Sequence, residues 1–344
     1  MPTLPSNPTV AIVGATGAVG VELLGSIEQR AFPAASVRAL ASARSAGMKL
    51  PFAGDELTVE ELGPGSFEGI DVALFCASGA VSREHAQNAL DAGAVVIDNS
   101  SAFRMDPAVP LVVPEVNAEA IGDATLIANP NCSTIIMVTA VNAIERAFGI
   151  ERVCVATYQA VSGAGAPGLE ELERLTAQAA AGAELAPEFF PFPCVHNVFC
   201  HESPTDPVTG RNVEEQKLID ESRKIWNRPD LRATATCVRV PVPRAHAEAV
   251  NLTLREAVTE PAFRAALDGA PGVRIVDDRA SPRFPMPVDA SGGDDVLVGR
   301  IRPDESQGRT GDAFVGWDLF CCGDQLRKGA ALNALQIAEL LLPR

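Results

Sequence analysis

A short apolar run followed by regularly spaced glycines constrains the fold of this chain more than any other feature. Val10–Val13 is typical of a buried strand, and Gly14–Gly20 (GATGAVG) follows it directly, where a stretch with helical periodicity, Ala18–Arg30, begins. Glycines at such a junction allow a tight turn and let a pyrophosphate approach the N-terminus of the helix. The segment predicts a dinucleotide site. Its predicted contacts are Gly14, Thr16, Gly17, Ala18, Val19 and Gly20.

Short apolar runs and helical stretches continue to alternate over the first third of the chain. The predicted strands are Ser36–Ala41, Ile70–Cys76, Ala94–Asp98 and Thr125–Ala128, and the predicted helix is Ser82–Ala92. This alternation is typical of α/β proteins and predicts a Rossmann-like, doubly wound parallel sheet.

After residue 132 the strand-like runs become longer and alternate more strongly. They are Arg152–Val161, Ala233–Val242, Ala249–Glu256 and Ala313–Cys321, with helical stretches at Leu169–Ala181, Val213–Ile225 and Pro261–Leu267. This pattern predicts a second, α+β domain with a mixed or antiparallel sheet. The last segment, Gln325–Leu342, has an amphipathic helical pattern and is expected to return to the first domain. The predicted domains are therefore 1–131 with 325–344, and 132–324.

The composition indicates a globular protein and disfavours several classes of partner. The chain has 344 residues, of which 47% are hydrophobic, and a formal net charge of -16, which argues against nucleic acid and anionic membranes as partners. The N-terminus has no pattern of a secretory signal, and no run approaches the roughly 20 apolar residues that span a bilayer. We therefore expect a cytoplasmic protein.

The eight cysteines are scattered, and without an export signal reduced thiols are the expected state. Cys194, His196, Cys200 and His201 could be read as a metal cluster. No C-x-x-C pair accompanies them, however, and the preceding Phe-Pro-Phe-Pro looks like a packed loop. No metal site is predicted.

The end of the second predicted strand bears on the choice of cofactor. NAD-selective sites place an acidic residue there to bind the ribose hydroxyls. Residues 40–45 contain no acid and offer the guanidinium of Arg44 and the hydroxyls of Ser42 and Ser45, which suit a 2'-phosphate. This favours NADP over NAD, with an ordinary polar turn as the alternative.

Cys132 lies between an apolar run that ends at Asn129-Pro130 and the apolar, alanine-containing stretch Thr134–Phe148. This places its thiol near the first turn of a helix, where the backbone N–H groups and the helix dipole favour the thiolate. The alternative is a small buried apolar residue, which is the usual role of a cysteine.

Three further stretches carry functional side chains. Tyr158–Gly165 ends a strand in a glycine-rich turn, Glu214–Lys217 opens a helix with a charge pair one turn apart, and Arg239–His246 places an arginine and a histidine around a proline-bearing strand end. Taken singly, the charge pair could be solvated and the histidine could be a surface residue. Together they supply an imidazole, an amide and cationic anchors beside the thiol.

With these features the chain resembles the aspartate-semialdehyde dehydrogenase family over nearly its whole length. The motifs that carry the resemblance are Gly14–Gly20, Asn99–Arg104, Val113–Asn117, Asn129–Ser133, Gln159–Gly165, Arg239–His246 and Gly323–Gly329. Glyceraldehyde-3-phosphate dehydrogenase would show Ser-Cys-Thr-Thr-Asn around its nucleophile, and N-acetylglutamyl-phosphate reductase a Gly-Cys-Tyr/Phe context. This chain has neither.

The resemblance implies a reversible reaction in which L-aspartate 4-semialdehyde, phosphate and NADP+ interconvert with 4-phospho-L-aspartate and NADPH, on the route to lysine, threonine and methionine. It implies Cys132 as the nucleophile that forms a thioester, and Gln159 as a residue that orients the substrate. It implies His246 as the acid/base, whose ordinary pKa of roughly 6.5 suits proton transfer near neutrality.

The implied substrate anchors have both signs of charge. Arg239 matches the ligand of the α-carboxylate, and Glu214, with Glu215 as a neighbouring alternative, matches the ligand of the ammonium group. The remaining implied ligands are Arg104 and Lys217 for phosphate, and Ser162, Gly163 and Gln325 near the nicotinamide. The family also implies a homodimer, or a tetramer built from two dimers, with the second domain, which is implied to be catalytic, at the interface.

A non-catalytic NADP-binding paralogue that serves as a scaffold or sensor is the alternative from a different class. Such a protein would be expected to lose the thiol or the histidine. Cys132, Gln159, Arg239 and His246 are all present.

Overall fold

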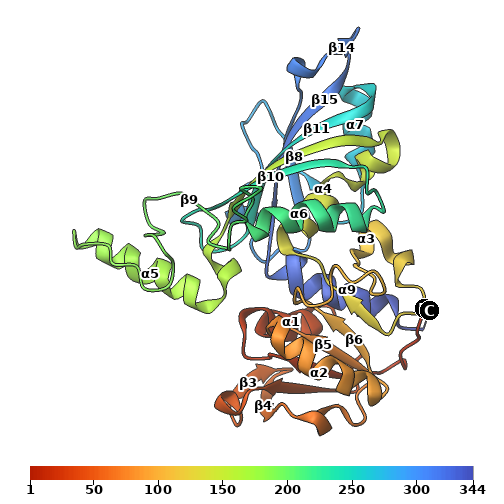
Figure 1. Cartoon of the computed structure of the whole chain (residues 1–344), viewed down its shortest axis with the longest axis vertical. Coiled ribbons are helices and arrows are strands. Elements are labelled where there is room, and N and C mark those ends of the chain that lie inside the picture. Colours follow the sequence, from red (N-terminus) through yellow and green to blue (C-terminus); the bar gives the residue numbers. More distant parts are fainter. Residues whose placement is uncertain (344) are drawn as a thin grey trace. The chain divides into compact units, whose positions relative to one another are not determined.

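The computed structural model describes residues 1–343 and divides the chain into two compact units. One contains Met1–Asn131 and the residues from Ala330 onward, and the other is Cys132–Gly329 (Figure 1). The chain leaves the second unit five residues later than the expected return at 325, because the intervening residues bond within that unit. Asp324 Oδ2 accepts a hydrogen bond from Arg244 Nε at 2.6 Å, and Gln325 Oε1 accepts one from the Ala245 N–H at 2.8 Å.

The first unit contains a seven-stranded sheet with the order β3-β4-β2-β1-β5-β6-β7. Its strands are β1 (Thr9–Val13), β2 (Ser36–Ala41), β3 (Lys49–Phe52), β4 (Asp55–Glu61), β5 (Val72–Phe75), β6 (Val95–Asp98) and β7 (Leu126–Ala128). All neighbours pair in parallel except β3 and β4, which form an antiparallel hairpin. The predicted doubly wound parallel sheet is therefore confirmed, and the hairpin is an addition.

Helices cover both faces of this sheet because the residues of its central strand alternate between two cores. Val10 and Ile12 of β1 pack in one core with α1 and α9, and Ala11 and Val13 pack in the other with α2. The helices of the unit are α1 (Ala18–Gln29), α2 (Gly79–Asp91), α3 (Pro114–Asn117) and α9 (Leu332–Leu340), with 3-10 turns η1 (Ala43–Ser45), η2 (Pro64–Phe67) and η3 (Ala118–Ile121).

The C-terminal helix differs from the amphipathic helix expected over Gln325–Leu342. The α-helix covers only Leu332–Leu340, and a π-helical turn, Arg327–Ala331, precedes it. Most of its residues are buried, including Asn333, whose amide donates to Val112 O at 3.0 Å and to Asn129 Oδ1 at 2.6 Å. A polar residue here is satisfied inside the fold and does not mark a solvent face.

The second unit contains an eight-stranded sheet with the order β12-β13-β15-β11-β8-β10-β9, and β14 pairs with β15. The strands are β8 (Ile150–Gln159), β9 (Phe199–Cys200), β10 (Arg232–Arg239), β11 (His246–Thr259), β12 (Val273–Ile275), β13 (Val296–Pro303), β14 (Arg309–Thr310) and β15 (Ala313–Gly323). The pairs β8–β10 and β12–β13 are parallel and the others are antiparallel. The predicted mixed sheet is confirmed, whereas β9, β12, β13 and β14 were not predicted.

The two faces of this sheet differ in burial. Val153, Val155 and Thr157 of β8 are buried on the face that α4 contacts, and they alternate with the half-buried Cys154 and the exposed Tyr158 on the opposite face. The helices of the unit are α4 (Cys132–Phe148), α5 (Ala166–Ala180), α6 (Val213–Ile225), α7 (Glu260–Leu267) and α8 (Pro287–Ala290), with η4 (Val161–Ala164) and η5 (Glu305–Gln307). The α4 face is therefore the interior of the unit.

Candidate active site

The glycine turn of the first unit is fixed by close contacts that a side chain would break. Gly14 has a φ of +86°, and a Cβ there would lie 2.9 Å from the backbone of Cys76. A Cβ on Gly20 would lie 2.4 Å from Gly14 O. These two glycines let the turn pack against the end of β5 and against the first turn of α1.

A cavity of about 480 Å³ opens at this turn within the first unit. Its lining contains five of the predicted cofactor contacts, namely Gly14, Thr16, Gly17, Arg44 and Ser45, whereas Ala18, Val19 and Gly20 lie in the first turn of α1 and are not part of the lining. The lining residues that the sequence did not point to include Leu62, Cys76, Val81 and His85. They belong to segments after β4 and β5 and to α2, which only the parallel sheet brings to one edge.

The polar part of the cavity wall comes from the turn after β2. Arg44 is exposed in η1, and Thr16 Oγ1 lies 3.5 Å from the hydroxyl of Ser45. The lining residues include Arg44 and His85 but no aspartate or glutamate. The wall therefore suits an anionic ligand.

Cys132 is the first residue of α4 and is half-buried. A Cβ on Gly329 would lie 2.9 Å from the Cys132 Cβ, so glycine is required beside it. Desolvation raises the pKa of the half-buried Cys76 thiol to about 12, and burial raises the pKa of the buried Cys237 and Cys322. Its position at a helix N-terminus sets Cys132 apart from these three thiols.

The strand register brings three of the predicted residues into one row across the sheet of the second unit. Arg239 pairs with Gln159 across β10 and β8, and His246 precedes Ala247, which pairs with Tyr158 across β11 and β8. Arg239 and Gln159 are each 1% exposed and His246 is fully buried. Residues up to 87 positions apart in the sequence thus become neighbours on the interior face.

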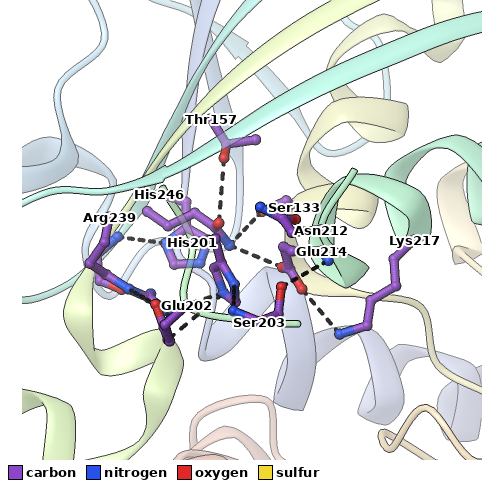
Figure 2. Close-up of polar contacts among 12 residues, drawn as sticks. Ser133, Thr157, His201, Glu202, Ser203, Asn212, Glu214, Lys217, Arg239 and His246 are labelled. Carbon is purple, nitrogen blue, oxygen red and sulfur yellow. Dashed lines mark hydrogen bonds and ion pairs between the residues drawn. The ribbon is translucent and has the colours of Figure 1, made fainter. Parts of the chain in front are cut away.

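The amide of Gln159 joins α4, the helix that begins at Cys132, to the charge pair of α6. Its Nε2 donates to Ser133 Oγ at 3.2 Å and to Glu214 Oε1 at 3.0 Å. The other Glu214 oxygen accepts from Lys217 Nζ at 3.0 Å (Figure 2). Because Glu214 is only 4% exposed, the reading of this pair as a solvated helix pair is wrong.

Glu215 has a different role from Glu214. It forms a capping box with Asn212 at the N-terminus of α6, and its Oε1 accepts from the Cys237 N–H at 3.2 Å. Both oxygens therefore hold backbone groups of the unit, and Glu214 is the acid that bonds to Gln159.

The imidazole of His246 is held as one tautomer. Its Nδ1 accepts from the Ala160 N–H at 3.0 Å, so the proton of the neutral ring lies on Nε2. Nε2 is buried and has no hydrogen-bond partner among residues 1–343. Burial and the nearby Arg239 lower the pKa of His246 to about 3, so the expected ordinary value does not hold and the ring is neutral at neutral pH.

The guanidinium of Arg239 lies against several groups of the same unit. Its NH1 donates to Ala160 O at 2.8 Å, and its Nε and NH2 donate to the two oxygens of Glu202 at 3.3 and 2.5 Å (Figure 2). Its NH2 also lies 3.1 Å from His201 Nε2, and its Cζ lies 5.5 Å from the ring centroid of Phe190. No sequence pattern pointed to Glu202, an acid in a loop rich in polar residues.

The three residues implied near the nicotinamide support the turn beside His246. Gln325 Nε2 donates to Ser162 Oγ at 2.7 Å, and Ser162 Oγ donates to Pro243 O. A Cβ on Gly163 would lie 2.9 Å from His246 Cε1. Glycine at this position leaves the space that the imidazole occupies.

Arg104, implied as a phosphate ligand, is largely buried in the first unit. Its Nε donates to Asn129 O at 2.9 Å and its NH2 donates to Asn99 O at 2.6 Å. The guanidinium thereby ties the segment after β6 to the segment after β7.

The part of the chain that the structure describes contains no group of three histidine, cysteine or acidic side chains that could hold a metal ion. Of the residues considered for a metal cluster, Cys194 is buried in an apolar cluster and His201 lies against Arg239. Within the same residues, every helix is too short or too polar to cross a membrane.

Comparison with known proteins places both units in one family. Residues 9–124 match the family described as semialdehyde dehydrogenase, NAD binding domain, and residues 141–328 match semialdehyde dehydrogenase, dimerisation domain. The aspartate-semialdehyde dehydrogenase of Synechocystis sp. is 49% identical over 99% of each chain, and that of Bacillus subtilis is 45% identical over 96% of each.

A solved structure agrees with these matches. The crystal structure of aspartate semialdehyde dehydrogenase II from Vibrio cholerae, complexed with ASA, superposes with a TM-score of 0.92 at 41% identity and covers 97% of this chain and 98% of that one. This chain belongs to the aspartate-semialdehyde dehydrogenase family.

Proposed function

We propose that this chain is an aspartate-semialdehyde dehydrogenase that interconverts 4-phospho-L-aspartate and NADPH with L-aspartate 4-semialdehyde, phosphate and NADP+. The reaction is a step in the biosynthesis of lysine, threonine and methionine. The observation that carries the proposal is the row of Arg239, Gln159 and His246, with Gln159 bonded to the residue that follows Cys132. Family membership supports the same reaction.

NADP is the proposed cofactor, with the first unit as its binding domain. The residues fit such a group, because the cavity beside Gly14 has an open glycine turn, a basic wall at Arg44 and no acid in its lining. Arg44 and Ser45 would hold the 2'-phosphate, and the first turn of α1 would face the pyrophosphate. When bound, the nicotinamide supplies or accepts the hydride.

Cys132 is the proposed nucleophile. Its thiolate attacks the acyl carbon of 4-phospho-L-aspartate, the bond from that carbon to the phosphate oxygen breaks, and phosphate leaves with the electron pair. The product is a thioester on Cys132, which reduction converts to the aldehyde and the free thiolate. The N-terminus of α4 stabilises the thiolate at the start and the end of this sequence.

His246 is proposed to act as a neutral hydrogen-bond donor. Because Nδ1 already accepts the Ala160 N–H, the group left for chemistry is the Nε2 proton. A neutral imidazole can stabilise the negative charge that develops on the substrate carbonyl oxygen without carrying a charge of its own. This refines the acid/base role implied by the family resemblance.

The charged side chains are proposed to bind the two ends of the substrate. Arg239 binds the α-carboxylate, since a guanidinium fork matches a carboxylate. Glu214 is preferred to Glu215 for the ammonium group, because Glu215 already holds a helix terminus and a strand N–H. Lys217 and Arg104 are the proposed phosphate ligands.

We further propose a cytoplasmic homodimer formed through the second unit, as the family description of residues 141–328 suggests. The half-buried to exposed face of its sheet, which carries Cys154 and Tyr158, is the surface proposed for the dimer contact. A tetramer would need a second contact between dimers.

A direct assay tests the proposed reaction. Purified protein with L-aspartate 4-semialdehyde, phosphate and NADP+ should form NADPH, and the rate should vanish when phosphate is omitted. A protein that binds NADP but forms no NADPH under these conditions would instead be the non-catalytic paralogue.

A further inference from the structure

A carboxylate of the chain itself occupies the fork of Arg239. Glu202 accepts from Nε and from NH2, which is the two-point contact that a bound carboxylate makes with a guanidinium. The other nitrogen, NH1, donates to the carbonyl of Ala160, a backbone group that cannot leave. The end-on pair of nitrogens is also engaged, since NH2 lies 3.1 Å from His201 Nε2. A substrate carboxylate that makes two hydrogen bonds with the Nε–NH2 edge of Arg239 must take the positions that Glu202 holds.

Glu202 is the more accessible member of this ion pair. Its side chain is 24% exposed, compared with 2% for Arg239, and it belongs to the loop between β9 and α6. Burial opposes the ionisation of Glu202, but its hydrogen bonds and ion pair with Arg239 outweigh burial, and the net effect lowers the pKa of this carboxyl. Glu202 is thus an ionised carboxylate with an open path to solvent.

The neighbours of Glu202 extend the same contact toward the ammonium ligand. His201 lies beside Arg239 NH2, and the Ser203 hydroxyl accepts from the Glu214 N–H at 3.2 Å (Figure 2). The tripeptide His201–Ser203 therefore spans the two residues to which the proposed function assigns the charged groups of the substrate.

We propose that Glu202 is a specificity-determining residue that occupies the carboxylate position on Arg239 and yields it to the α-carboxylate of the substrate. This inference rests on the proposed function, which assigns Arg239 to that carboxylate.

The exchange follows from the cost of a buried charge. An Arg239 that lost the Glu202 carboxylate would be an uncompensated buried cation, so the displaced Glu202 must be replaced by another anion of matching shape. An aldehyde that lacks a carboxylate cannot replace Glu202, so Glu202 stays bound to Arg239. Glu202 also prevents phosphate, the other anion of the reaction, from binding to Arg239.

The test is Glu202→Gln in the full-length enzyme, assayed in the phosphorylating direction. The amide keeps the shape but removes the competing charge, so the KM for L-aspartate 4-semialdehyde should fall by roughly 5- to 10-fold while kcat changes less than about twofold. Succinate, a dicarboxylate without the ammonium group, should inhibit more strongly by a similar factor. High phosphate should become inhibitory, because Arg239 would be open to it.

Glu151→Gln is the matched control. Glu151 lies at the opposite end of β8 from Gln159 in an exposed ion pair with Arg232, and its substitution should leave the KM unchanged. A KM that stays constant or rises in Glu202→Gln overturns the exchange. If that variant does not fold, Glu202→Asp, which shortens the reach to Arg239, should still lower the KM, and an unchanged or higher KM overturns the proposal.

Arg239→Lys separates this proposal from the one on which it rests. If Arg239→Lys leaves the KM for the semialdehyde unchanged, the assignment of Arg239 to the carboxylate is wrong. If Arg239→Lys raises the KM and Glu202→Gln does not lower it, Arg239 keeps its role and only the exchange fails.

Discussion

The candidate sites of the two units differ in how far apart their residues lie in the sequence. In the first unit, the turn Gly14–Gly20 contributes Gly14, Thr16 and Gly17 to the cavity wall, and contacts with the neighbouring backbone require glycine at positions 14 and 20. In the second unit, Arg239, Gln159 and His246 come from three strands and meet only through the sheet register. A local signature marks the first site, whereas the second depends on the whole topology.

Burial also separates the two sites. Arg44 of the first unit is exposed, so its removal is expected to change affinity for a ligand and little else. His246, Arg239 and Glu214 are buried, so changes there should alter the chemistry and the stability of the second unit together. The following predictions test this division, from the largest expected effect to the smallest.

Cys132→Ser should reduce turnover by on the order of 10⁴-fold or more, because a serine hydroxyl stays protonated near pH 7. The fold and the affinity for NADP should be retained, which fluorescence titration with NADPH can measure. As the control, Cys154→Ser removes a half-buried thiol on the opposite face of the second-unit sheet and should keep full activity. An alkylating agent that labels another cysteine before Cys132, with loss of activity, would contradict the assignment.

His246→Gln should lower kcat by roughly 100- to 1000-fold, the scale of losing one donor to a developing oxyanion. The folded pKa of His246 is about 3, so this residue should not titrate near pH 6.5. The profiles of kcat/KM against pH for the wild type and the variant should therefore have the same shape around pH 6.5. A wild-type step near pH 6.5 that His246→Gln abolishes would restore the acid/base role with an ordinary pKa.

The sequence predicts most of what is local in this fold. It identified the strand–turn–helix at Gly14–Gly20 and placed Cys132 at a helix start, because each depends on a short run of residues. It missed the hairpin of β3 and β4, whose second strand, Asp55–Glu61, contains four acidic residues and lacks a clean apolar pattern. Edge strands need few apolar residues, so their signal is weak.

The sequence could not supply the contacts that depend on register or on loops. Nothing near Glu202 in the chain predicts its ion pair with Arg239, 37 positions away. The neutral state of His246 likewise arises from burial and from Arg239, which no local pattern shows. The motifs predicted which residues matter, and the structure adds how their charges and protons are arranged.

Arg44→Ala should weaken NADP binding by roughly 10- to 100-fold, the scale of one charge-assisted hydrogen bond, and should leave NAD binding almost unchanged. Isothermal titration with both cofactors measures the difference. An equal loss for NAD and NADP would mean that Arg44 supports the turn after β2 and does not read the 2'-phosphate. This outcome would also contradict the expectation that exposed residues of the first-unit site affect only the affinity for a ligand.

Lys217→Met should raise the KM for phosphate by roughly tenfold, with a smaller effect on the semialdehyde, because Lys217 is only partly buried beside Glu214. The measurement varies phosphate at saturating levels of the other two substrates. An unchanged phosphate KM would leave Lys217 as the ion-pair partner of Glu214 alone.

The smallest expected effect is the change in the stability of the second unit per pH unit. Two residues of β11 should change this stability in opposite directions as the pH varies. The pKa of His246 is lowered from its ordinary 6.5 to about 3, so below pH 6.5 the unfolded chain binds a proton that the folded chain does not. This makes the folded state less stable as the pH falls from 6.5 toward 3, by at most about 1.4 kcal/mol per pH unit.

Glu248 is also fully buried, and burial raises its pKa well above the ordinary 4.5. Above pH 4.5 the unfolded chain releases a proton that the folded chain keeps, so Glu248 makes the folded state less stable as the pH rises. Both tryptophans of the chain, Trp226 and Trp317, lie in the second unit, and their fluorescence in urea follows its unfolding. His246→Gln should flatten the loss of stability below pH 6.5, and Glu248→Gln should flatten the loss above pH 4.5. If both variants kept the wild-type slopes, these two groups would titrate alike in the folded and unfolded chains, and the buried charges of the second unit would not distinguish it from the first.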